Sequence, residues 1–395
     1  MAAFASDKNL KLASRSPGRL CDTRLMIDPI QLLCDLVAMP TQQAGPDGIA
    51  GDERAVCEYL APLLQQLGAD HVEIEDAPRK HGGPGAYIYA SWGRATTLLN
   101  AHIDTVPANN GWSQNPWQPQ RSAERISGLG ACDTKGAIAA GLAAVQAIAP
   151  ADRQGFALLF SGDEERGTAS VDKFLASPLR STIQRAIVCE PTARRAGVTH
   201  RGVSSYRARL QGEGGHSSKA DHLTKPLAAL ARLATRLDDY AVANLHTGPV
   251  DMPGLCLNIA ALTGGVAFNV IPTSAELQFS LRPAPGFDAA VWQKSLASFA
   301  AAIDARIEIT QAVDHAPFAS LDANAMTAWV APHVRSVGPL DFWTEAALYQ
   351  AVGIDAVVIG PGDIAQAHSA DEWVAIADIH WAADTFRHLL QTHHA

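Results

Sequence analysis

TTLLNAHID (residues 96–104) joins a short apolar run to two polar side chains. The apolar run is typical of a buried β-strand. His102 and Asp104 are two residues apart, so at the end of a strand their side chains point to the same side. A metal-bound imidazole usually has a carboxylate that orients it, and this pattern therefore favours a metal ligand. The alternative is a buried histidine that is hydrogen-bonded to a nearby aspartate.

A second apolar run, FALLFS (156–161), is followed by three consecutive acids, Asp163, Glu164 and Glu165. Adjacent carboxylates after a buried strand repel one another, which is costly unless cations compensate. Neighbouring glutamates also suit a division of roles, in which one binds a metal and the other acts as a general base. The alternative is a solvated acidic loop.

Asp133 lies in GACDTKG (130–136), directly before a helix that we expect over 135–149. Glycines let the backbone turn tightly, and this brings Asp133 close to another segment of the chain. A carboxylate has two oxygens and can bridge two cations. The alternative is a helix N-terminus with an acidic cap.

Two more candidate ligands follow apolar runs. Glu190 comes directly after AIVC (186–189), and His368 ends the loop GPGDIAQAH (360–368) that follows DAVVI (355–359). Each signal is weak alone, because a single histidine of this kind is more often structural.

The combination carries the prediction, because α/β folds place their sites at the carboxyl ends of several strands. The set offers two nitrogens and several oxygens, which suits zinc, cobalt or manganese better than calcium. The candidate ligands are His102, Asp133, Glu165, Glu190 and His368.

The order of elements predicts an α/β fold with a mainly parallel central sheet and helices on both sides. Near Gly197 the pattern of expected strands and helices changes to that of a smaller α+β unit, and the α/β pattern returns after about residue 315. Within the α+β unit, apolar and polar residues alternate strictly in SAELQFSLRP (274–283). We therefore expect a catalytic domain made of 28–198 and 315–395, with a second domain, 199–314, inserted into it.

The composition bounds the function. The chain has 395 residues, 47% hydrophobic and 18% charged, which is typical of a soluble globular protein. A net charge of −9 without a basic stripe argues against nucleic acid, and no apolar run is long enough for a membrane span. Six scattered cysteines fit a reducing cytoplasm. Residues 1–27 lack the apolar core of a secretory signal, so we expect a disordered extension before an internal start at Met26.

Five motifs in this order resemble the co-catalytic zinc metallopeptidases and aminoacylases. That family includes acetylornithine deacetylase, succinyl-diaminopimelate desuccinylase and carboxypeptidase-type relatives. The resemblance runs from about residue 28 to residue 392. The motifs are H-x-D at 102–104, G-x-x-D-x-K-G at 130–136, D-E-E at 163–165, E-P-T at 190–192 and G-P-G…A-H at 360–368.

The resemblance implies two divalent metal ions, most naturally zinc or cobalt. Asp133 would bridge the two ions. His102 and Glu190 would complete one metal site, and Glu165 and His368 the other.

The resemblance also assigns the residues around the metals. Asp104 would orient the imidazole of His102, and Glu164 would be the general base. In this family the peptide bond after the bridging aspartate is cis, which here is the bond from Asp133 to Thr134.

The inserted domain resembles the dimerisation, or lid, domain of the family, which implies a homodimer. His216 in GGHS (214–217) would help to bind the scissile carbonyl, often across the dimer, and Asn269 would lie near the substrate. Arg282 would meet the substrate carboxylate. Ser280 stands where the family usually has an aspartate, so the support of this arginine differs here.

Two segments most resemble the branch that deacetylates acetylornithine and acetylcitrulline, namely DFWTEA (341–346) and GPGDIAQAHSADEW (360–373). Glu345 would accept a hydrogen bond or a charge from the far end of the substrate side chain, and Gly362 would line the same site. The alternative for Glu345 is an acid stabilised at a helix N-terminus.

The expected function is therefore removal of acetyl from N-acetyl-L-ornithine or N-acetyl-L-citrulline in arginine biosynthesis, by a cytoplasmic homodimer. The substrate would be a small N-acyl amino acid. A carboxypeptidase, a dipeptidase or a succinyl-diaminopimelate desuccinylase of the same family is the alternative. A metal-binding scaffold without catalysis is a third reading, but such a relative should have lost Glu164.

Overall fold

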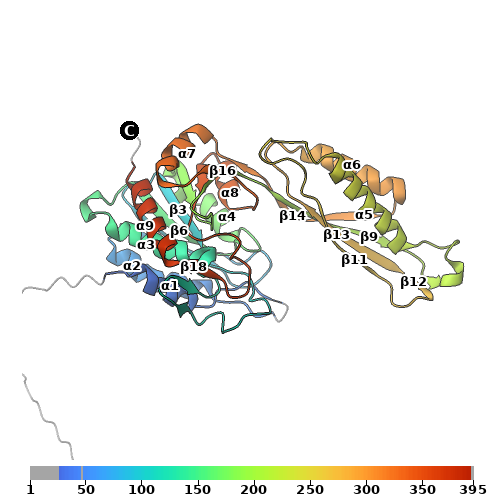
Figure 1. Ribbon diagram of the computed structural model, residues 1–395, viewed down its shortest axis with the longest axis horizontal. Helices are drawn as coiled ribbons and strands as arrows, with labels where there is room; N and C mark the ends of the chain where they lie inside the picture. Colours follow the sequence, from blue (N-terminus) through green and yellow to red (C-terminus); the bar gives the residue numbers. More distant parts are fainter. Residues whose placement is uncertain (1–25, 46–47, 393–395) are drawn as a thin grey trace, which may run out of the picture.

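The computed structural model describes residues 26–45 and 48–392. Figure 1 shows a larger part, built from both ends of the described chain, and an elongated smaller part that extends from it. The predicted extension over 1–27 lies outside the described residues, apart from its last two.

The larger part is built on a nine-stranded mixed sheet, in the order β1-β2-β6-β3-β7-β17-β8-β15, with β16 paired to β8. Its four central strands, β6, β3, β7 and β17, are parallel to one another. The pairs from β1 to β6 and from β17 to β15 are antiparallel, while β16 is parallel to β8. The parallel part predicted from the sequence is therefore the centre of the sheet. The strands are β1 (His71–Asp76), β2 (Ala86–Trp92), β3 (Thr97–His102), β6 (Phe156–Ser161), β7 (Arg185–Val188), β8 (Ala196–His200), β15 (Phe318–Ala319), β16 (Val337–Leu340) and β17 (Asp355–Val358).

Helices cover both faces of this sheet. Neighbouring residues of a strand point to opposite sides, and in the central strands both sides carry apolar side chains that are buried. Leu99 and Leu158 belong to the core under α1, α2, α3, α7 and α9, whereas Leu98 and Leu159 belong to the core under α4 and α8. The helices are α1 (Pro29–Val37), α2 (Glu53–Gln66), α3 (Gly136–Ala147), α4 (Ala169–Ala176), α7 (Ala323–Val330), α8 (Ala346–Ala351) and α9 (Ile376–Gln391).

Local sequence explains where helices begin. The Asp28 side chain accepts a hydrogen bond from the Ile30 amide at 2.9 Å, and Pro29 occupies the first turn of α1. Pro226 likewise occupies the first turn of α5 (Pro226–Ala243).

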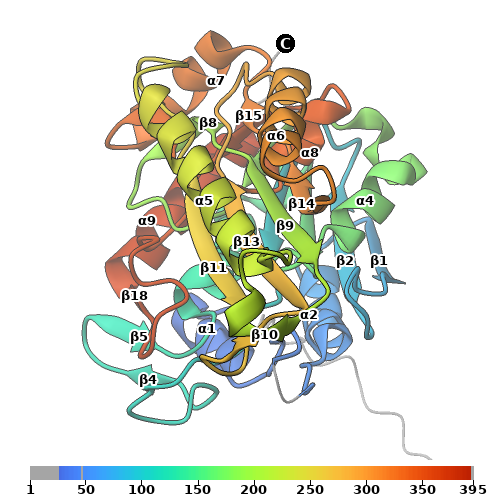
Figure 2. The ribbon, with the colours of Figure 1, turned by 90° about the vertical axis from the view of Figure 1, so that its right-hand side faces the viewer.

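The smaller part is a four-stranded antiparallel sheet in the order β11-β13-β9-β14, with α5 and α6 on one face (Figures 1 and 2). The alternation predicted in β13 is present, since Ala275, Leu277, Phe279 and Leu281 are all buried. These elements are β9 (Val203–Gln211), α5 (Pro226–Ala243), β11 (Asn258–Gly264), β13 (Ser274–Leu281), α6 (Ala289–Ile303) and β14 (Glu308–His315).

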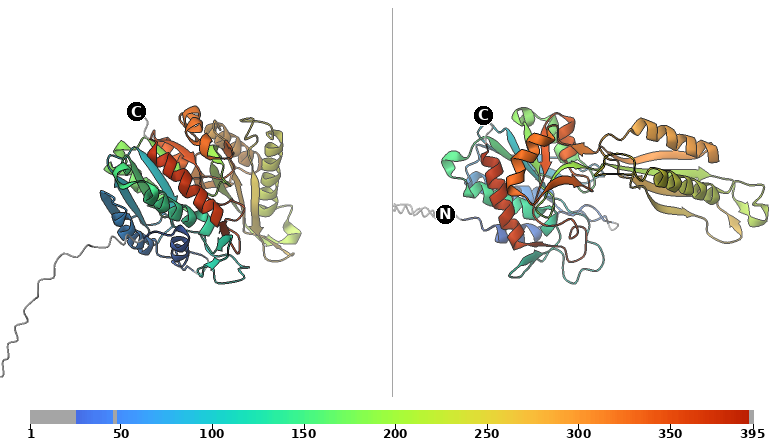
Figure 3. Two further views of the ribbon diagram at one scale, coloured as in Figure 1. Left: turned by 60° about the vertical axis from the view of Figure 1, so that its left-hand side comes forward. Right: turned by 45° about the horizontal axis from the view of Figure 1, so that its top comes forward.

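Two short sheets complete the fold. β10 (Gly215–His216) pairs with β12 (Val270–Ile271) at the far end of the smaller part (Figure 1). β4 (Gln120–Arg121), β5 (Arg125–Ser127) and β18 (Trp373–Ala375) form a third sheet beside the large one (Figure 3). Within residues 26–45 and 48–392, no helix is long and apolar enough to cross a membrane.

A buried ion pair fastens α2 to the loop after β1. Arg79 Nε donates to Glu53 Oε1 at 2.7 Å, with both side chains almost fully buried. Arg79 also donates to the carbonyls of Gln42 and Gly51, and Glu53 accepts from the amide of Ala86. The pair therefore joins α2 and the loop after β1 to the segment before α2 and to the start of β2.

Replacing Arg79 with methionine leaves the Glu53 carboxylate buried without its cation. We expect Arg79→Met to lower the free energy of unfolding by about 3–5 kcal/mol. The midpoint of urea unfolding measures this loss. Arg54→Ala is the matched control, because its pairs with Glu58 and Asp76 are exposed to solvent and should contribute little. Equal midpoints for the two variants would contradict the argument.

Candidate metal centre

The candidate ligands meet at one edge of the large sheet. His102 ends β3, and Glu165 follows β6 by four residues. Glu190 follows β7, and His368 lies in the loop after β17. The four strands are neighbours and parallel, so their carboxyl ends share an edge, as the sequence predicts.

Asp133 lies between the two histidines. Its Oδ1 is 2.9 Å from His102 Nε2, and its Oδ2 is 3.4 Å from His368 Nε2. His368 Nε2 is also 3.0 Å from Glu165 Oε2. His102, Asp133 and Glu165 form a group whose ligand atoms all lie within 4.8 Å of one another. Each oxygen of Asp133 therefore points to a different imidazole, which is the arrangement that a bridging carboxylate requires.

These spacings fit a metal ion. Around a tetrahedral ion with bonds of about 2.0–2.1 Å, neighbouring ligand atoms are about 3.3 Å apart. The nitrogen-to-oxygen separations of 2.9–3.4 Å at Asp133 agree with that value. The donor set of imidazoles and carboxylates also suits zinc or cobalt.

The electrostatics of the cluster favour positive charge. Hydrogen bonds to Asp133 and Glu165 raise the pKa of His368 to about 11. Burial by itself would lower the pKa of His102, but hydrogen bonds to Asp104 and Asp133 raise it well above its usual value. The carboxylates therefore create a field that stabilises a cation between them.

The surrounding glutamates are unfavourable to ionise in the absence of a cation. Burial raises the pKa of Glu164, Glu165 and Glu190, and the negative charges of neighbouring acids raise it further. Divalent cations would relieve this repulsion, so a cluster of buried acids indicates a cation site.

Asp104 acts mainly on the segment that carries the two glutamates. Its carboxylate accepts from the backbone amides of Glu164 and Glu165, both at 3.1 Å, and from Gln43 Nε2 at 2.7 Å. The nearest carboxylate oxygen is 3.6 Å from His102 Nδ1, whereas the backbone oxygen of Asp104 is only 2.9 Å away. The hydrogen bond that orients His102 thus comes from the main chain of Asp104, a detail that the sequence motif does not reveal.

The turn that carries Asp133 is held from several sides. The bond between Asp133 and Thr134 is cis, as the family resemblance implies. The Thr134 hydroxyl donates to the carbonyl of His102 at 2.8 Å. Gly130, with φ of 80°, lets the chain enter the turn in the left-handed region.

Glu345 is buried and does not cap a helix, although it lies at the start of α8. Its Oε2 accepts from the Ser161 hydroxyl at 2.8 Å. Asn100 Nδ2 donates to that hydroxyl oxygen at 2.9 Å, and Tyr349 donates to Asn100 Oδ1 at 2.9 Å. The other oxygen, Oε1, has no hydrogen-bond partner among the described residues. Burial raises the pKa of Glu345 to about 7.

Gly362 serves close packing beside the cluster. Its φ is 84°, and a side chain there would collide with Cys132 Sγ. Its carbonyl accepts from the amide of Ala193 at 2.6 Å. The described contacts therefore involve its backbone and its lack of a side chain.

The residues predicted on the inserted domain are not brought to the cluster. His216 and Asn269 lie together near the paired strands β10 and β12, where the Ser217 amide donates to the carbonyl of Asn269 at 3.0 Å. Both side chains are exposed. Arg282 directly follows β13, whose last residues pair with the start of β9, so it lies where the smaller part joins the larger.

Two side chains that hold the surroundings of the candidate ligands were not identified from the sequence. Gln43 donates to Asp104, and Glu372 accepts from the amide of Asp133 at 3.1 Å. The only local signal for Glu372 is its position four residues after His368. Gln43 has no signal, because it precedes the first motif by almost sixty residues.

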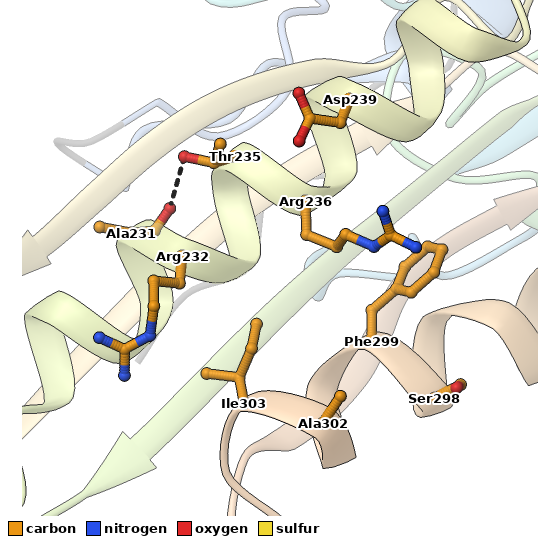
Figure 4. A pocket seen from close by; sticks show the side chains of 9 residues that line it. All are labelled: Ala231, Arg232, Thr235, Arg236, Asp239, Ser298, Phe299, Ala302 and Ile303. Atoms are coloured by element: carbon orange, nitrogen blue, oxygen red, sulfur yellow. Dashed lines mark hydrogen bonds between the residues drawn. The ribbon is translucent and has the colours of Figure 1, made fainter.

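A hollow lies elsewhere, between α5 and α6 (Figure 4). Its volume is about 580 Å³, and Arg236 stacks over the ring of Phe299 within it. Its lining contains Asp239 but none of the candidate ligands. This hollow is therefore separate from the candidate metal centre.

Known proteins provide an independent comparison. N-acetyl-L-citrulline deacetylase from Xanthomonas campestris pv. campestris is 34% identical to this chain, over 94% of the chain and 100% of that protein. Acetylornithine deacetylase from Proteus mirabilis is 28% identical, over 89% of this chain and 92% of that protein.

Solved structures agree on the fold. An M20 family metallo-carboxypeptidase from Sulfolobus solfataricus has a TM-score of 0.76 at 17% identity and covers 92% of this chain and 98% of its own. A dinuclear metal-binding M20 peptidase from Bacillus subtilis has a TM-score of 0.63 at 16% identity, with 92% and 96% covered.

The chain also matches the description of peptidase family M20/M25/M40 over residues 98–392. This range includes every candidate ligand and the inserted domain. The chain is therefore a hydrolase of the M20/M25/M40 peptidase family.

Proposed function

We propose that this enzyme removes the acetyl group from N-acetyl-L-citrulline or N-acetyl-L-ornithine, releasing acetate and the free amino acid for arginine biosynthesis. The observation that carries the proposal is the placement of Asp133 between two imidazoles, with Glu164 next to the candidate ligand Glu165. The extent of the similarity to N-acetyl-L-citrulline deacetylase supports the choice of an acetylated amino acid.

The proposal assigns two divalent ions, zinc or cobalt, to five side chains. Asp133 would bridge the two ions, His102 and Glu190 would hold one, and Glu165 and His368 would hold the other. When bound, such ions polarise a carbonyl oxygen and lower the pKa of water to about 7.

The residues of the chain supply the remaining chemistry. Glu164 takes a proton from the attacking water and delivers it to the nitrogen of the leaving amino acid. Asp104 keeps Glu164 and Glu165 in place through their backbone amides. The burial of His102 and Asp133 keeps bulk water away, so that each charge acts in a low dielectric.

Substrate recognition is assigned to two charged side chains. Arg282 binds the substrate carboxylate, because a planar guanidinium matches the two carboxylate oxygens. Glu345 is the candidate acceptor for the far end of the substrate side chain, and its free Oε1 supports this assignment. A carboxylate accepts equally from the ammonium of ornithine and from the ureido group of citrulline. Gly362 keeps the adjacent loop close to Cys132.

We further propose a homodimer in the cytoplasm. His216 and Asn269 are exposed at the end of the smaller part, away from the cluster of their own chain, so a partner chain is needed to place them beside a substrate. The phenyl ring of Phe268, next to Asn269, is fully exposed as well. The five described cysteines are all free, which suits a reducing compartment.

The first test is a product assay with metal-free and reloaded protein. A chelator should abolish activity, and zinc or cobalt should restore it. Acetylcitrulline, acetylornithine, succinyl-diaminopimelate and dipeptides are offered separately. Release of acetate from the first two, with slower turnover of the others, is expected. Faster cleavage of dipeptides would replace the proposal with a dipeptidase, and full activity without metal would end it.

The second test separates the roles of two neighbouring glutamates. Glu164→Gln keeps the shape of the side chain but cannot accept a proton, so kcat should fall by about 10²–10⁴-fold while both metals stay bound. Glu165→Gln should lose a metal together with activity. Metal analysis and steady-state kinetics on both variants decide the matter. The reverse pattern would exchange the two roles, and a fully active Glu164→Gln would refute the mechanism.

The third test asks whether His216 acts across the dimer. Glu164→Gln and His216→Ala should each be inactive alone. After subunit exchange at equal amounts, half of the dimers are mixed and each mixed dimer holds one intact site. Activity should then return to about a quarter of the wild-type value. No recovery, with exchange verified by mass spectrometry, would place His216 outside the partner's site.

A further inference from the structure

The carboxylate of Glu372 accepts hydrogen bonds from three backbone amides of the turn that carries Asp133. Its Oε1 accepts from Cys132 at 2.8 Å and from Asp133 at 3.1 Å. Its Oε2 accepts from Gly130 at 3.1 Å. Only 1% of Glu372 is exposed, so these bonds do not compete with water.

The backbone on both sides of Glu372 is fixed as well. Its carbonyl accepts from the amide of Gly128 at 2.9 Å, and the strand that follows, β18, pairs with β5. On the other side, the amide and hydroxyl of Ser113 hold the Asp371 carboxylate, both at 2.9 Å. Glu372 therefore has little freedom to move away from the Asp133 turn.

The segment that ends at Glu372 also carries His368. Asn109 donates to the carbonyl of His368 at 3.0 Å, so this end of the segment is anchored too. One side chain thus links the loop of one candidate ligand to the loop of another. The two ligands concerned, Asp133 and His368, approach to 3.4 Å.

A carboxylate suits this task better than any other side chain. The three amides all donate, and a carboxylate has two oxygens that only accept. A glutamine has one acceptor oxygen, and its NH₂ group would face a backbone N–H.

We propose that Glu372 is a positioning residue, which holds Asp133 and His368 at the spacing that two metal ions require. The proposal rests on the metal centre of the proposed function, but not on the identity of the substrate. Groups that orient metal ligands typically change metal affinity by 10–100-fold when they are removed.

The test is a metal titration of the apoprotein of Glu372→Gln with cobalt, followed through the absorbance of the bound ion. At least one of the two binding steps should weaken by about 10–100-fold. The kcat lost at low cobalt should recover when cobalt is raised to saturation, since Glu164 is untouched. Asp378→Asn is the matched control, because this acid lies six residues away and forms a half-buried ion pair with Arg194, outside the candidate metal centre.

Amide exchange provides a readout that needs neither metal nor substrate. In the apoprotein of Glu372→Gln, the peptide that covers 128–135 should exchange faster, while the peptides of β3 and β6 stay unchanged. If Glu372→Gln does not fold, Glu372→Asp keeps the charge on a shorter side chain and should show a smaller loss of affinity.

Unchanged cobalt affinity and unchanged exchange in a folded variant would overturn the proposal. Weakened binding in a protein that does not deacetylate either candidate substrate would support Glu372 and reject the deacetylase. Wild-type protein that binds no metal would reject both.

Discussion

The structure depends on one electrostatic constraint: three acids and two imidazoles lie together at the carboxyl ends of four parallel strands. Without cations the ionised forms of Glu165 and Glu190 are unfavourable, because burial and the negative charge of Asp133 raise the pKa of both. Two further buried acids hold the backbone of the segments that carry candidate ligands. Amides of the Glu164 and Asp133 segments donate to Asp104 in one case and to Glu372 in the other. The candidate ligands are therefore positioned through their own main chain.

The backbone around the centre is held by further buried polar contacts. Asp163 and His368 both adopt positive φ angles, of 63° and 56°. The Asp163 carboxylate accepts from the amides of Lys80 and Ala169, which fixes the turn before Glu164. Below this layer, the Arg79–Glu53 pair joins α2 to the loop after β1. Stability and site geometry thus share the same buried polar contacts.

Part of this arrangement is predictable from the sequence, because His102, Glu165 and Glu190 end or closely follow apolar runs that form strands. Each of these signals is weak alone, and only the combination carries the prediction. Gln43 and Glu372 have no comparable signal, since they act on residues far away in the chain through amide hydrogen bonds. Sequence spacing also does not reveal that the Asp104 carboxylate, 3.6 Å from the imidazole of His102, accepts from two backbone amides. The antiparallel edges of the sheet have no separate signal, because a fully buried strand has the same composition in either direction.

The junction between the two parts determines what one chain can bring to a substrate. Arg201 is buried there, and its guanidinium donates to the carbonyls of Pro253, Gly254 and Arg282. The backbone of Arg282 is therefore fixed relative to the large sheet. His216 lies at the opposite end of β13, and an eight-residue strand spans about 26 Å at 3.3 Å per residue. A small amino-acid derivative cannot reach both ends of that strand. If both side chains bind one substrate, they must come from different chains, with Arg282 contributed by the chain that holds the metals.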